Sequence, residues 1–157
     1  NEIINNLMLE KYQKYFMLNK NLLIAIATSI IISAIVAHVL SKQANYLNTT
    51  YTLLVDYVIY FSVFSGLYYL DNRKKYLLES NLIDKSKLKH DLIKLITSLG
   101  IAEVVYTIAR WFLQYYFLTM NYDAYLASII SQTISMIICL IVINLSVKMT
   151  RLYKDEN

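Results

Sequence analysis

The feature that most constrains the fold of this chain is a set of four long apolar stretches, residues 22–40, 51–70, 95–118 and 124–147. A membrane-spanning helix needs about 20 mostly apolar residues to cross roughly 30 Å of hydrocarbon, and each stretch is about that long. Soluble domains turn at Gly and Pro, yet the 157 residues include two Gly and no Pro. We therefore expect an all-α protein, an integral membrane four-helix bundle that forms a single membrane domain.

The basic residues between these stretches predict the topology. Lys and Arg of short loops are retained on the cytoplasmic side of a membrane. Thirteen of them lie before residue 22, in the basic loop 71–94 or after residue 147, whereas the other two connections hold only Lys42. This predicts a multi-pass protein of the cell membrane with both termini and the basic loop in the cytoplasm. Because the charges sort by membrane side and not onto one face, nucleic acid is not an expected partner.

Residues 1–20 and the basic loop both mix charged and apolar side chains. In residues 1–20 the apolar side chains recur at helical spacing, which predicts an amphipathic helix lying along the inner membrane interface. The basic loop is interpreted as a solvated segment that sets the topology. The alternative interpretation of this loop is a docking surface for a partner or for anionic lipids.

The third stretch carries a polar face. Glu103, Thr107, Arg110 and Gln114 follow one another at intervals of four, three and four, so they share one side of a helix. An ionisable group at the bilayer centre costs about 2.5 to 3.5 kcal/mol, so such groups turn inward and find partners. Asp56 of the second stretch lies at a depth similar to that of Arg110, and we expect an ion pair with further hydrogen bonds from Gln114 or a deep tyrosine. Glu103 lies about 10 Å further along the helix, without an evident charged partner.

Small side chains recur on the first and fourth stretches. Membrane helices associate through close packing of small residues, because lipid tails are as apolar as Leu and supply no hydrophobic drive between helices. We expect helix packing along two small-residue ridges, which consist of Ala25, Ser29, Ser33 and Ala37 in the first stretch and Ala124, Ser128, Ser131 and Ser135 in the fourth.

No pattern of reactive side chains predicts catalysis. Cys139 is the single cysteine, and the two histidines, His38 and His90, are predicted on opposite sides of the membrane, so they cannot share a metal ion. No Ser, His and Asp trio is placed for nucleophilic chemistry. We expect neither an enzyme acting by itself nor a bound cofactor or metal.

One patch prompts a family comparison. The stretch Gly100-Ile-Ala-Glu-Val-Val-Tyr-Thr-Ile-Ala-Arg-Trp111, together with the size and span count of the chain, resembles the small accessory membrane subunits of the archaeal ammonia monooxygenase type. In that family copper and substrate belong to other chains, so the resemblance implies a subunit without ligands of its own. The chain is also similar to the small four-span helpers that move lipid-linked sugars, but its middle loop is longer and their glycine-rich first span is missing.

Two functions compete at this point. The first is a non-catalytic accessory subunit that docks onto other integral membrane subunits through the small-residue ridges and the polar face, with membrane lipids around it. The alternative is a small transporter or a flippase for lipid-linked substrates, in which Glu103 and Arg110 line a proton or anionic-substrate path. Transporters with midplane sites usually show helices interrupted by Gly or Pro, and the unbroken stretches here favour the accessory role.

Overall fold

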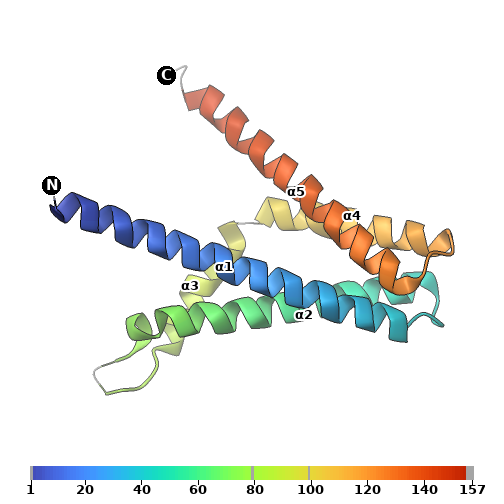
Figure 1. Cartoon of the computed structure of the whole chain (residues 1–157), viewed down its shortest axis with the longest axis horizontal. Helices are drawn as coiled ribbons and strands as arrows, with labels where there is room; N and C mark the ends of the chain where they lie inside the picture. Colours follow the sequence, from blue (N-terminus) through green and yellow to red (C-terminus); the bar gives the residue numbers. More distant parts are fainter. Residues whose placement is uncertain (1, 79, 99, 155–157) are drawn as a thin grey trace.

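The computed structural model describes residues 2–78, 80–98 and 100–154, which form helices joined by short connections (Figure 1). Residues 155–157 of the predicted cytoplasmic C-terminal segment lie outside the described residues. Over those ranges the structure has no strand, and a single antiparallel bridge joins Leu77 to Ile83. The expectation of an all-α protein is confirmed. The elements in chain order are α1 (Glu2–Val39), α2 (Asn45–Asn72), a short 3-10 helix η1 (Arg73–Tyr76), α3 (Lys85–Ser98), α4 (Gly100–Thr119) and α5 (Ala124–Lys154).

Three of the described helical segments are long and apolar enough to cross a membrane, namely Phe16–Val39, Asn45–Tyr76 and Ala124–Val142. This is consistent with membrane association. Helix α4, which contains most of the predicted third span, is not among the three. The reason lies in its composition, because its 20 residues include the polar or charged side chains of Glu103, Arg110 and Gln114.

The N-terminal segment differs from the prediction of a separate interfacial helix over residues 1–20. Helix α1 runs from Glu2 to Val39 as one helix of 38 residues. No Gly or Pro stands in this range, so no residue favours a change of backbone direction before the apolar part begins. The predicted interfacial helix is therefore the first part of α1.

The predicted third span, residues 95–118, also differs from the structure. Residues 95–98 close α3, and α4 begins at Gly100. Gly in a helix interior costs up to about 1 kcal/mol relative to Ala, which makes its position a favourable place for one helix to give way to another.

The predicted basic loop 71–94 contains η1 and most of α3. Asp91 of α3 accepts hydrogen bonds from Lys75 Nζ and from Tyr76 Oη, the latter at 2.8 Å. These two donors, Lys75 first, hold the pKa of the Asp91 carboxyl below its usual range. The contacts tie α3 to η1.

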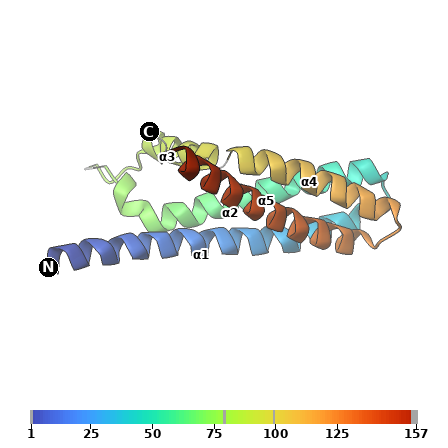
Figure 2. The same ribbon diagram turned by 90° about the horizontal axis from the view of Figure 1, so that it is seen from above.

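Four helices form a closed ring in which α1 packs on α2, α2 on α4, α4 on α5, and α5 on α1. Ala37, Leu118, Ala124 and Ala127 make an apolar core near the α1–α2 and α4–α5 connections. Toward the chain termini α5 diverges from α1 (Figures 1 and 2). The ring is therefore tightly packed at one end and opens toward the other.

Both predicted small-residue ridges face the inside of this ring. None of their eight residues is more than 7% exposed, and these are Ala25, Ser29, Ser33, Ala37, Ala124, Ser128, Ser131 and Ser135. Small side chains at these positions let the backbones of α1 and α5 approach each other closely.

Candidate functional site

The structure brings Asp56 of α2 and Arg110 of α4 together. Arg110 Nε lies 3.2 Å from Asp56 Oδ2, and both side chains are buried. Arg110 is the largest fully buried side chain among the described residues. A buried ion pair tolerates the loss of water only when further hydrogen bonds satisfy its remaining donors and acceptors.

Helix α5 satisfies the rest of the guanidinium. Arg110 Nη1 donates to Ser128 O at 2.9 Å and to Ser131 Oγ at 2.9 Å, and Arg110 Nη2 donates to Ser128 Oγ at 3.2 Å. The two serines were predicted as packing residues. They also supply the acceptors that keep the positive charge inside the ring.

The carboxylate of Asp56 has two further donors. Tyr106 Oη donates to Asp56 Oδ2 at 2.7 Å, and Gln132 Nε2 donates to Asp56 Oδ1 at 2.9 Å. Gln132 Nε2 also lies 3.1 Å from Ser29 Oγ on α1. The network around the ion pair therefore joins all four helices of the ring.

The other predicted members of the polar face bond elsewhere. Gln114 Nε2 donates to Asn48 Oδ1 at 3.2 Å and does not reach the ion pair, so the deep tyrosine Tyr106 supports the pair and Gln114 does not. Thr107 Oγ1 donates to Glu103 O at 2.7 Å and contacts Tyr57 Oη. Glu103 lies outside the network of Asp56 and Arg110.

Sequence reasoning missed Gln132 and Asn48. Gln132 follows Ser131 directly and lies four residues after Ser128, so it shares the side of α5 that faces the pair. A search for every amide within the apolar stretches, matched by depth to Asp56, would have found it. Asn48 precedes the second predicted span by three residues, and its Nδ2 donates to Ala37 O at 2.8 Å.

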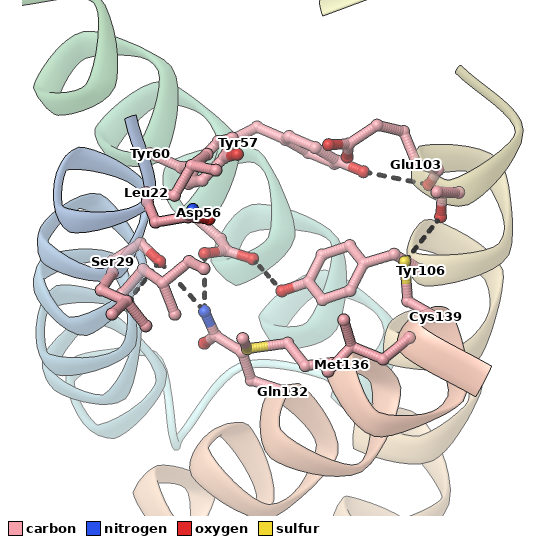
Figure 3. Close-up of a pocket in the computed structure, with 15 residues that line it drawn as sticks. Leu22, Ser29, Asp56, Tyr57, Tyr60, Glu103, Tyr106, Gln132, Met136 and Cys139 are labelled. Atoms are coloured by element: carbon pink, nitrogen blue, oxygen red, sulfur yellow. Dashed lines mark hydrogen bonds between the residues drawn. The ribbon is translucent and has the colours of Figure 1, made fainter. Parts of the chain in front are cut away.

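A cavity of about 520 Å³ lies among α1, α2, α4 and α5, directly beside this network (Figure 3). Leu23 and Leu140 belong to its lining and are 66% and 58% exposed. The cavity is therefore open between α1 and α5, which diverge from each other toward the chain termini. Its polar and aromatic lining consists of Asn19, Ser29, Asp56, Tyr57, Tyr60, Glu103, Tyr106 and Gln132, and its other lining side chains are Leu22, Leu23, Ile26, Ala102, Met136, Cys139 and Leu140.

Glu103 is half-buried in the cavity wall. Within the described part of the chain its carboxylate has no ion-pair partner within 4 Å, whereas the other carboxylate of the lining, Asp56, is paired with Arg110. Tyr57 Oη approaches the backbone oxygen of Glu103 at 3.3 Å. The cavity thus presents one acidic side chain without a protein counter-charge.

Metal-binding groups do not gather in this region. Among the residues that the structure describes, no three His, Cys, Asp or Glu side chains lie close enough together to hold a metal ion. Cys139 lines the cavity, where its Sγ lies 3.4 Å from Ala102 O.

Comparisons of the chain with protein families, with characterised proteins and with solved structures found no match. The resemblance based on residues 100–111 therefore stays a prediction.

Proposed function

We propose that this chain is a small membrane transporter whose cavity holds an amphipathic organic substrate. The observation that carries the proposal is the cavity of about 520 Å³ with Glu103 on its wall and an opening at one end of the ring. Small-molecule sites are typically mostly apolar clefts of roughly 300–1,000 Å³ with a few placed polar groups. The lining combines these features, and an intramembrane carboxylate is by default a candidate for function.

Arg110 has a scaffolding role in this proposal. It is fully buried, every nitrogen of its guanidinium is hydrogen-bonded, and it is not part of the cavity lining. A path for anionic substrates that uses Arg110 would have to dismantle those bonds. Glu103 is the charged side chain left to meet a substrate.

The proposed membrane placement includes α4 as a fourth spanning helix. Its polar face turns into the ring, while Val104, Ile108 and Phe112 are each more than half exposed on the outside. A helix with apolar side chains outward and polar ones inward fits a lipid environment when other helices surround its polar face. With the termini in the cytoplasm, as the basic residues predict, the cavity opens toward the cytoplasmic side.

The surfaces expected to dock a partner subunit are largely used for packing within this chain. Both small-residue ridges are buried within the ring, and Arg110 and Gln114 of the polar face bond to residues of the same chain. A partner subunit would need another docking surface. Transport is therefore the function that the geometry supports better.

Movement of amphipathic probes by purified protein in liposomes tests the proposal. We expect the chain to move at least one of three probes (ethidium, taurocholate or a fluorescent phosphatidylcholine) faster than empty liposomes do. Ile26→Trp fills the cavity from α1 and should slow this movement. Ile31→Trp, on the same helix, places the same side chain at a position that is 61% exposed and should leave the movement unchanged.

Two results would contradict the proposal. One is that none of the three probes moves and the chain migrates on a native gel only together with other membrane proteins, as an accessory subunit would. The other is that Ile26→Trp moves the probes as fast as the unmodified chain, although the substitution leaves the protein folded.

A further inference from the structure

We infer that the cavity selects lipophilic organic cations, an inference that rests on the proposed transport function and names its substrate class. Asp56 and Glu103 are the two charged side chains among the lining residues, and that lining contains no Lys, Arg or His. Asp56 is compensated by Arg110 at 3.2 Å. The carboxyl group of Glu103 is therefore left for a cationic ligand to pair with.

Several hydrogen-bond donors around the cavity are already used within the protein. Tyr106 Oη donates to Asp56, and Gln132 Nε2 donates to Asp56 and Ser29. Thr107 directs its hydroxyl proton to Glu103 O, so Tyr57 is the donor in the contact between Tyr57 and Thr107. A ligand that needs donors from the wall, as a carboxylate or a phosphate does, finds few of them here.

One buried acceptor of the lining has no donor. Gln132 is 1% exposed and its Oε1 has no hydrogen-bond partner within the described structure. A buried carbonyl oxygen without a donor carries a desolvation penalty of about 1–3 kcal/mol, which a ligand N–H or a water held by the ligand would relieve. Gln132 lines the same cavity as Glu103 (Figure 3).

Aromatic rings of the lining can also attract a positive charge. Tyr57, Tyr60 and Tyr106 belong to the lining, and the rings of Tyr57 and Tyr106 stand edge to face with centroids 6.2 Å apart. Ring faces attract cations, and desolvation strengthens the attraction. The remaining wall is largely aliphatic, including Leu22, Ile26 and Met136, and suits the hydrocarbon part of the same molecule.

The single cysteine provides a test that needs no knowledge of the natural substrate. Cys139 lies on the cavity wall, and its Sγ contacts the backbone of Ala102, the neighbour of Glu103. Two methanethiosulfonate reagents of similar size, one with a trimethylammonium group and one with a sulfonate, can be reacted with the full chain in detergent. Each rate is divided by the rate with free glutathione, which corrects for the intrinsic reactivity of the reagent.

We expect the corrected rate of the cationic reagent to exceed that of the anionic reagent by at least about tenfold, because a nearby unpaired carboxylate attracts one and repels the other. Glu103→Gln should reduce the ratio to near one, and Glu103→Asp should preserve most of it. Cys139→Ser should abolish labelling and so shows that Cys139 is the reacting group. The cationic reagent should also react more slowly when tetraphenylphosphonium is present.

The outcomes separate the inference from the proposed function. If neither reagent modifies Cys139 in the folded chain, the cavity does not admit water-soluble ligands and the proposed function itself fails. If both react at equal corrected rates, the cavity admits ligands but has no preference for cations, and only the inference is overturned. A ratio that persists in Glu103→Gln would also overturn the inference, because Glu103 would not be its source.

Discussion

Arg110 and Asp56 show how an ionisable pair can reside inside a packed assembly of helices. The guanidinium donates hydrogen bonds to four acceptor atoms, and the carboxylate accepts hydrogen bonds from three donors. Each charge is therefore surrounded by groups of the complementary kind. Removing one member would leave the others without the charge to which they are oriented.

We expect Asp56→Asn or Arg110→Gln alone to lower the free energy of unfolding by about 3–5 kcal/mol, since each leaves a buried charge uncompensated. The double variant should lose clearly less than the sum of the two single losses. Denaturant unfolding of the purified chain in detergent, followed by circular dichroism, measures both quantities.

The charge-swapped variant, Asp56→Arg with Arg110→Asp, serves as a control on the surrounding groups. It should not restore stability, because a carboxylate at position 110 would face the Ser128 carbonyl oxygen and a guanidinium at position 56 would face the donors Tyr106 and Gln132. Full rescue by the swap, or single variants as stable as the unmodified chain, would show that this network does not hold the helices together.

At the scale of the helix, the packing of α1 depends on the side chains that it presents to α5. Its buried side contains small residues, and its other side carries large apolar ones such as Ile31 and Ile35. This division was visible in the sequence as a repeat of four residues. The sequence did not show that α1 is continuous from residue 2. An amphipathic segment and a spanning segment have different hydrophobic patterns, even when both belong to one unbroken helix.

Ser33 makes a sharp test of the α1 ridge. It is fully buried, and its Oγ has no partner among the described atoms. Ser33→Leu should lower the free energy of unfolding by about 1–3 kcal/mol through overpacking. Ser33→Ala should cost nothing or stabilise the protein slightly, because an unsatisfied buried hydroxyl is removed.

Ile35→Leu is the matched control for this series, because residue 35 lies on the same helix and is 58% exposed. It should unfold like the unmodified chain in the same detergent. A tolerated Ser33→Leu, with the midpoint of unfolding unchanged, would mean that α1 and α5 are not closely packed at this point.

At the scale of the whole molecule, the membrane orientation decides what the cavity can reach. The connection between α1 and α2 and the connection between α4 and α5 lie at the closed end of the ring, while η1 and α3 follow α2 at the other end (Figure 2). The basic residues within 73–75 and 85–94 belong to η1 and α3 and so lie toward that second end. On the basis of the positive-inside rule we propose that the cavity opens toward the cytoplasm.

Cysteine labelling of intact cells tests this orientation. In a Cys139→Ser background, Gln43→Cys in the α1–α2 connection should react with a membrane-impermeant maleimide added outside. Ser86→Cys in α3 should react only after the membrane is opened. Both positions are exposed, so a difference in reactivity reports the membrane side and not burial. The reverse labelling pattern would place the cavity opening on the outer side of the membrane.

Local properties of the chain were sufficient for much of the architecture. Apolar length predicts helices such as α2 and α5, and a spacing of four, three and four puts Glu103, Arg110 and Gln114 on one side of α4. Matching depths predicted Asp56 as the neighbour of Arg110. These inferences need only the helical rise and repeat, which are the same wherever the helix lies.

The tertiary structure decided which polar groups meet. Gln132 bonds to Asp56 and Gln114 to Asn48 because four helix axes approach at particular distances, which no single helix pattern encodes. The same geometry buries the small-residue ridges inside the chain and leaves Glu103 beside a cavity. Residue spacing along one helix sets which side chains share a face, but only the packing of all four helices sets what that face contacts.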